Sequence, residues 1–211
     1  MWIALNDLIV WRFFDDVLDE SADTLQRKGL YPPPPGASSI LGLELCGTVM
    51  ESAPDCSCRD WKVGDRVMAL VSGGAYAEYA TVSEGSAVLI PELTDGRPLF
   101  DDVTGAAVME TWLTAYQLLF TVGGARKGSR QTVLIHAGTS GVGVAATQLC
   151  HHLGLVPLVT TRSSAKVDIA REYGAFATCD TSKEDFAQWA KGITGGHGVD
   201  LILDCVGAKY R

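Results

Sequence analysis

The residues best suited to chemistry lie in the segment TVLIHAGTSGVGVAATQL, residues 132–149. An apolar run is followed by Gly141, Gly143 and Ala146 in the spacing GxGxxA. In a dinucleotide-binding loop the first glycine permits a tight turn and the second lets the backbone approach a pyrophosphate. The third small residue lets the following helix pack closely on the sheet and aim its N–H groups at the anion. We therefore interpret this segment as a dinucleotide-binding loop, the alternative being that the glycines only turn the chain.

The choice of dinucleotide should depend on the residues about twenty positions further on, where NAD-binding proteins place an acid against the ribose 2′-hydroxyl. Residues 160–166 read TTRSSAK, and the next acid, Asp168, falls within the following predicted helix. Arg162, Lys166 and the neighbouring hydroxyls suit a 2′-phosphate. The sequence thus favours NADPH over NADH, although a solvated helix N-terminus would have a similar composition.

The elements that must position this loop alternate between strand and helix from Lys127 onwards. Such alternation requires parallel strands joined by right-handed crossovers, in a doubly wound sheet. The predicted strands are 132–137, 156–161, 176–179 and 201–206, and the predicted helices are 144–152, 165–173 and 183–192.

The first half of the chain has a different pattern. Between residues 41 and 92 short apolar runs are bounded by turn residues, which predicts a twisted antiparallel sheet or small barrel. Residues 1–30 read as helical or mixed, and a helical period begins near Asp101. Tyr31 precedes four prolines, so it lies either in a rigid surface loop or over a cleft.

Composition excludes several classes of partner. The net charge of −8 has the wrong sign for binding to nucleic acid or to an anionic membrane. The six cysteines form no CxxC pair, and Cys56 and Cys58 are separated by only one residue. This pattern favours free thiols over a metal site. The apolar N-terminal run is interrupted by polar residues, is shorter than the ~20 residues of a membrane span and lacks signal-peptide features. We therefore expect a cytoplasmic protein.

Several separate motifs, in order, resemble the quinone oxidoreductase branch of the medium-chain dehydrogenase/reductase family. The resemblance covers about residues 22–207 and implies a β-rich chaperonin-10-like domain, residues 1–109, followed by a Rossmann domain, residues 110–211. It rests on ADTLQRKGLYPPPPGASSILGLELCG (22–47), WKVGDRVMAL (61–70), GGAYAEYATV (73–82), ETWLTAYQLL (110–119), VLIHAGTSGVG (133–143) and LILDCVG (201–207).

The resemblance implies NADPH as the cofactor and assigns residues to it. Thr114 would contact the nicotinamide end, and Cys205 with Val206 the adenosine side. Ser163 and Lys166 would hold the 2′-phosphate. The pyrophosphate would lie against the glycine loop, namely Gly138, Thr139, Ser140, Gly141, Val142 and Gly143.

The resemblance also implies hydride transfer to a quinone or a related electron-poor acceptor, with Tyr31 lining the cleft as the candidate catalytic residue. Zinc-dependent relatives carry the motif GHE, where this chain has Leu43 between Gly42 and Glu44, so a mechanism without zinc is implied. An enoyl thioester or another α,β-unsaturated carbonyl compound is the alternative acceptor, because fold alone does not separate these activities.

The chain departs from the family pattern at three places. Glu20 replaces an asparagine of the active cleft, and Thr181 replaces a tyrosine that closes over the 2′-phosphate. The first strands are replaced by an unrelated segment, and the chain stops before the last Rossmann strands, so we expect an incomplete Rossmann domain. The family's homodimer uses an edge strand of that absent segment, which argues against a dimer here. A truncated product that only binds nucleotide is therefore a third alternative.

Overall fold

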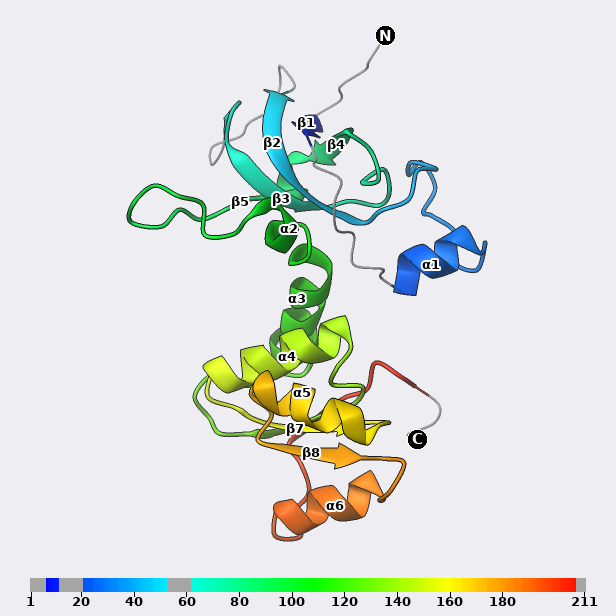
Figure 1. The fold of residues 1–211 in the computed structure, drawn as a ribbon, viewed down its shortest axis with the longest axis vertical. Helices are drawn as coiled ribbons and strands as arrows, with labels where there is room; N and C mark the ends of the chain where they lie inside the picture. Colours follow the sequence, from blue (N-terminus) through cyan, green and yellow to red (C-terminus); the bar gives the residue numbers. More distant parts are fainter. Residues whose placement is uncertain (1–6, 12–20, 53–61, 208–211) are drawn as a thin grey trace. The chain divides into compact units, whose positions relative to one another are not determined.

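The computed structural model describes residues 7–11, 21–52 and 62–207 (Figure 1). Its contacts divide the chain into two units, Met1–Glu110 and Thr111–Arg211. The expectations for Glu20, Cys56 and Cys58 fall outside the described residues. The four cysteines within them, Cys46, Cys150, Cys179 and Cys205, are free thiols as expected.

The first unit contains a five-stranded antiparallel sheet in the order β4-β1-β2-β3-β5. Burial alternates along β4: Ala80 and Val82 face the core, and their neighbours face solvent. One face of the sheet is therefore exposed to solvent at this strand. Leu45, Val49 and Val67 belong to the same core. The strands are β1 (Asp7–Trp11), β2 (Glu44–Ser52), β3 (Arg66–Leu70), β4 (Tyr79–Ser83) and β5 (Ala87–Leu89).

The N-terminal part of the chain contributes a strand where a helical or mixed segment was expected. Strand β1 pairs with β2 on one side and with β4 on the other. These partners lie far away in sequence, and a short apolar run alone does not distinguish strand from helix. Helix α1 (Ser21–Arg27) follows, and its Asp23 carboxylate accepts hydrogen bonds from the Gly42 N–H at 3.3 Å and the Tyr76 hydroxyl at 3.0 Å.

The helical segment that begins near Asp101 is broken into pieces. Helix α2 (Asp102–Gly105) is capped by the Asp101 side chain, which accepts from the Thr104 N–H. Helix α3 (Met109–Tyr116) starts in the first unit and ends in the second, and a π-helical turn, η2 (Gln117–Val122), continues it.

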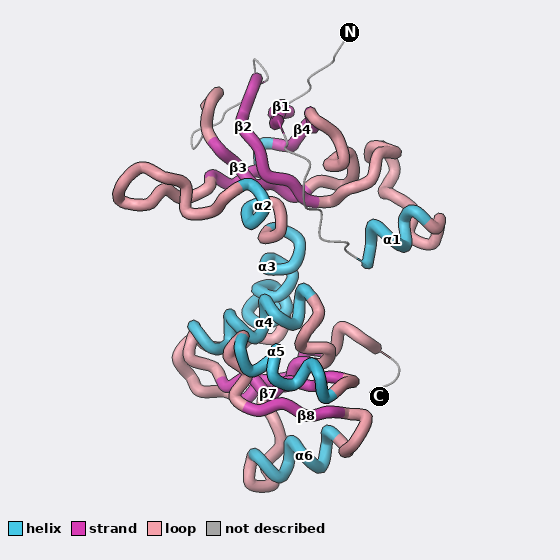
Figure 2. The backbone as a smooth tube through the Cα atoms, viewed as in Figure 1, coloured by secondary structure: helices cyan, strands magenta, loops and turns pink. Residues whose placement is uncertain are grey.

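The second unit contains a four-stranded parallel sheet in the order β8-β7-β6-β9, which confirms the doubly wound prediction. Helices α4 and α5 cover one face and α6 the other (Figures 1 and 2). The elements are β6 (Thr132–Ile135), α4 (Gly141–His152), β7 (Val156–Thr161), η3 (Ser164–Lys166), α5 (Val167–Glu172), β8 (Ala177–Asp180), α6 (Phe186–Ile193) and β9 (Leu201–Leu203).

Small residues allow α4 to approach this sheet closely. Ala145 and Ala146 are buried in the same core as Val133, Ile135 and Val159, which come from β6 and β7. Ala146 is therefore the close-packing residue that the GxGxxA spacing predicts.

In the described parts of the chain, no helix is long and apolar enough to cross a bilayer.

Candidate functional site

The candidate site lies at the carboxyl ends of the parallel strands, where the strand order changes direction. The chain runs outward from β6 through β7 to β8, and then crosses back to place β9 on the other side of β6. Ligands of open α/β sheets bind in the crevice outside the strand ends at such a switch point. The six predicted pyrophosphate contacts, residues 138–143, span the end of the β6–α4 connection and the first turn of α4 at this edge.

Two glycines of this loop are required by its own packing. A Cβ at Gly143 would lie 2.4 Å from the Ala137 carbonyl oxygen and 2.6 Å from the Gly138 Cα. A Cβ at Gly138 would lie 2.0 Å from Cγ1 of Val159 on β7. Backbone atoms cannot move aside as a flexible side chain does, so Gly143 in particular tolerates no side chain. This tight cradle fits a pyrophosphate held by backbone groups.

The turn at the end of β6 is made by a residue that the sequence argument did not select. Ala137 adopts a left-handed conformation with φ 52°, whereas the spacing assigned the tight turn to Gly141, which instead begins α4. A non-glycine residue in this region is strained, and such strain gathers at functional sites. No feature of the sequence around Ala137 signals this conformation.

Helix α4 presents its N-terminus to the same space. Ser140 is the N-cap, and its side chain accepts a hydrogen bond from the Gly143 N–H at 3.2 Å. The N–H groups of Gly141 and Val142 have no intrahelical acceptor, because no turn precedes them. These two N–H groups can therefore donate to an anion, and the positive end of the helix dipole favours it.

The predicted 2′-phosphate residues lie on the turn between β7 and α5. Thr161, the last residue of β7, donates from its hydroxyl to the Ser163 carbonyl oxygen at 3.1 Å. Lys166 and Arg162 are exposed, and Ser163 is half-buried. This turn is adjacent to the glycine loop, because the Gly138 N–H donates to the Thr160 carbonyl oxygen at 3.0 Å.

Asp180, an acid that the sequence analysis did not identify, also lies at this turn. Asp180 ends β8, is only 6% exposed and accepts a hydrogen bond from the Ser164 hydroxyl at 2.6 Å. The sequence search covered only residues that follow β7 directly. The signal that could have found Asp180 is the register of parallel strands, which pairs Thr161 with Asp180.

The remaining predicted cofactor residues are accessible. Cys205 and Val206 follow β9 at the same strand edge and are exposed, and the exposed Asp204 accepts from the Val206 and Gly207 N–H groups. Thr114 is half-buried on α3 in the second unit. Tyr31 lies in the first unit and is 50% exposed.

In the first unit, Glu44 belongs to the segment that corresponds to the zinc-binding motif GHE of other enzymes. Glu44 accepts a hydrogen bond from the Glu110 N–H at 2.9 Å, so its carboxylate binds the first turn of α3. Burial, with the charge of Asp23, raises the pKa of the Glu110 carboxyl group. Among the residues that the structure describes, no three His, Cys, Asp or Glu side chains cluster as metal ligands would.

His136 directly follows β6 and is buried against β7. Its Nδ1 is 3.0 Å from the Thr160 hydroxyl, and its ring meets Phe186 edge-on with centroids 4.8 Å apart. Burial lowers the pKa of His136 below the ordinary value of 6.5, while the Asp204 charge opposes this shift. The imidazole is therefore neutral in the folded protein at neutral pH.

We expect the unfolding free energy to fall as the pH is lowered below 6.5, because the unfolded chain then binds a proton that folded His136 does not. Urea unfolding at about pH 7 and about pH 5 measures this loss. His136→Asn, which keeps a partner for Thr160, should show a smaller loss. The same pH dependence in both proteins would assign the effect to other groups.

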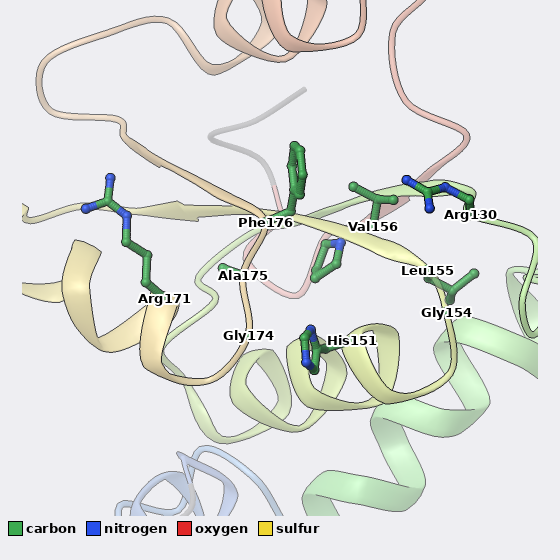
Figure 3. Close-up of a pocket in the computed structure, with 10 residues that line it drawn as sticks. Arg130, His151, Gly154, Leu155, Val156, Arg171, Gly174, Ala175 and Phe176 are labelled. Atoms are coloured by element: carbon green, nitrogen blue, oxygen red, sulfur yellow. The ribbon is translucent and has the colours of Figure 1, made fainter.

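A pocket of about 540 Å³ lies at the opposite, amino-terminal edge of the sheet, and none of the predicted site residues lines it. In Figure 3, Arg130 and Arg171 flank it, with Phe176 and His151 between them. Arg171 is paired with Asp168 at 3.0 Å. The other lining residues are Gly154, Leu155, Val156, Pro157, Gly174 and Ala175.

The family models that match the chain correspond to its two units. The model described as alcohol dehydrogenase GroES-like domain matches residues 20–92, and the model described as zinc-binding dehydrogenase matches residues 141–210. Together they cover more than half of the chain. This agrees with a β-rich GroES-like domain followed by a nucleotide-binding α/β domain.

Curated relatives and solved structures that resemble this chain are also oxidoreductases. A quinone oxidoreductase of Pseudomonas aeruginosa is 38% identical over 88% of this chain and 54% of the relative. A 2-haloacrylate reductase of a Burkholderia species is 32% identical over 88% and 54% of the two chains. The crystal structure of Escherichia coli quinone oxidoreductase complexed with NADPH superposes with a TM-score of 0.80 at 29% identity, covering 96% of this chain and 59% of that one.

The chain spans about half the length of the curated relatives it matches. The matched family models nevertheless fall in both units and include residues 141–143 of the glycine loop, while Leu43 stands where the zinc-dependent enzymes have histidine. The chain belongs to the medium-chain dehydrogenase/reductase family, in its zinc-free quinone oxidoreductase branch.

Proposed function

We propose that this chain binds NADPH at the carboxyl edge of its parallel sheet and belongs to an enzyme that reduces quinones or related electron-poor acceptors. The observation that carries the proposal is the cradle at Gly138 and Gly143, which leaves no room for a side chain at the switch point. The Gly141 and Val142 N–H groups would bind the pyrophosphate. Thr114 would bind the nicotinamide end, and the adenosine end would lie against the loop after β9.

When bound, NADPH supplies a hydride. Tyr31, a residue of the first unit that is 50% exposed, would donate a hydrogen bond from its hydroxyl to the acceptor oxygen and stabilise the negative charge that forms there. A quinone would take up this hydride and one proton from solvent, and so become a hydroquinone. Leu43 cannot coordinate zinc, and Glu44 already binds the Glu110 N–H, so polarisation of the acceptor falls to hydrogen-bond donors.

The acceptor is proposed as a quinone because quinone oxidoreductases occur among both the relatives and the solved structures. The 2-haloacrylate reductase favours a second candidate, an α,β-unsaturated acid or thioester. Both classes carry a double bond conjugated to a carbonyl group, so both are electron-poor and both can take up a hydride and a proton.

Calorimetric titration with NADPH, followed by assays with acceptors, tests the proposal. Oxidation of NADPH that requires a quinone would support it. Oxidation with 2-haloacrylate or an enoyl thioester but not with quinones would overturn the quinone assignment and keep the cofactor. Absence of NADPH binding would overturn the proposal as a whole.

A further inference from the structure

Asp180 lies at the carboxyl edge of the sheet, at a position that the strand register fixes. It is the last residue of β8, and in the parallel register it pairs with Thr161, the last residue of β7. The turn with the hydroxyls and cations of residues 162–166 starts directly after Thr161. A carboxylate at this place therefore faces the residues that we propose to bind the 2′-phosphate of NADPH.

The carboxylate of Asp180 is occupied by donors of the protein itself. One oxygen accepts from the Ser164 hydroxyl at 2.6 Å. The other accepts from the Ser182 hydroxyl at 2.7 Å and from the Ser182 N–H at 3.0 Å. Lys183 Nζ is 4.0 Å from the oxygen that binds Ser164. These hydrogen bonds, led by that of Ser164, lower the pKa of Asp180, so the group is ionised at neutral pH.

The residue after Asp180 holds the same turn from its other side. The Thr181 N–H and hydroxyl both donate to the Thr161 carbonyl oxygen, at 2.9 and 3.0 Å. Thr181 thus holds the start of the turn at the Thr161 backbone, and Asp180 holds its other end at the Ser164 side chain. Thr181 therefore helps to hold this turn in place.

Three roles are conceivable for an acid here, and its contacts favour one. An acid that reads the ribose 2′-hydroxyl needs free acceptor sites, and the Ser164 and Ser182 donors use three of the about four sites of this carboxylate and leave only one. An acid that merely repels a phosphate would not be bonded to the turn at 2.6 Å. Charge-assisted hydrogen bonds of this kind order the group that donates them.

We propose that Asp180 is a positioning residue for dinucleotide discrimination, which through Ser164 holds the β7–α5 turn so that Ser163 and Lys166 receive a 2′-phosphate. This inference rests on the proposed NADPH site. It predicts that Asp180 acts on ligands that carry the 2′-phosphate and leaves those with a free 2′-hydroxyl unaffected.

The test is calorimetric titration of the whole chain with adenosine 2′,5′-bisphosphate and with 5′-AMP. In Asp180→Asn, which keeps the side-chain shape, the bisphosphate should bind about three- to tenfold more weakly, the effect of losing one hydrogen bond. Binding of 5′-AMP should change less than about twofold. Ser164→Ala should reproduce the loss, and the double variant should lose no more than either single one.

Asp168→Asn is the matched control, because it removes the same charge from an exposed acid on α5 whose side chain is 82% accessible. It should leave both affinities unchanged. Tighter binding of the bisphosphate by Asp180→Asn would show that repulsion dominates, and weaker binding of 5′-AMP alone would show that Asp180 reads the ribose. Either result, or no change, overturns the inference while the NADPH proposal stands. Failure of the unaltered chain to bind either ligand overturns both.

Discussion

Replacing Gly143 with valine should abolish measurable NADPH binding. The first added carbon would already lie 2.4 Å from the Ala137 carbonyl oxygen and 2.6 Å from the Gly138 Cα. The loop must therefore open, which moves the Gly141 and Val142 N–H groups away from the pyrophosphate. Loss of two charge-assisted hydrogen bonds, at about 1.5–3 kcal/mol each, corresponds to a hundredfold or greater loss of affinity.

The matched control is Gly192→Ala, another helical glycine of the second unit. Nothing lies within 4 Å of a Cβ at Gly192, so this variant should bind NADPH normally. Circular dichroism and thermal unfolding show whether each variant is folded. A folded Gly143→Val protein with unchanged NADPH affinity would contradict the assignment of the loop.

Lys166→Ala should remove most of the preference for NADPH over NADH. Lys166 lies exposed in the turn after β7, next to Ser163, where a 2′-phosphate would be read. A charge-assisted hydrogen bond is worth about 1.5–3 kcal/mol, or roughly ten- to a hundredfold in affinity, and solvent exposure favours the lower part of that range. NADH, which lacks the phosphate, should bind equally to both proteins.

The control for this prediction is Lys191→Ala, which removes an exposed lysine from the last turn of α6. It should leave the ratio of the two dissociation constants unchanged. Equal affinities for NADPH and NADH in the unaltered chain would show that the residues of this turn do not select the cofactor.

Local patterns were sufficient to predict the second unit. Strand β7 has the predicted bounds, Val156–Thr161, because a buried parallel strand reads as a continuous apolar run. Helix α4 begins three residues before its predicted start, since Ser140 caps it ahead of the apolar period. Strand β9 ends at Leu203 rather than Val206, because Asp204 binds the following N–H groups and turns the chain away.

Features that depend on distant parts of the chain could not be predicted in this way. Strand β1 exists through its pairing with β2 and β4, and Glu44 finds its partner at Glu110 only in the folded unit. Asp180 reaches the β7–α5 turn through strand register, which a search along the sequence misses. In the candidate site, spacing identified the glycine loop, whereas tertiary structure decided the conformation of Ala137.

The most direct test of the account is a titration of the isotope-labelled chain with NADPH, followed by amide chemical shifts. We predict saturable shifts at the glycine loop, residues 138–143, and at the turn of residues 163–166. The pocket lined by Arg130, His151 and Phe176 at the other edge of the sheet should remain unchanged. Shifts confined to that pocket, with the glycine loop unaffected, would contradict the central claim that NADPH binds at the carboxyl edge.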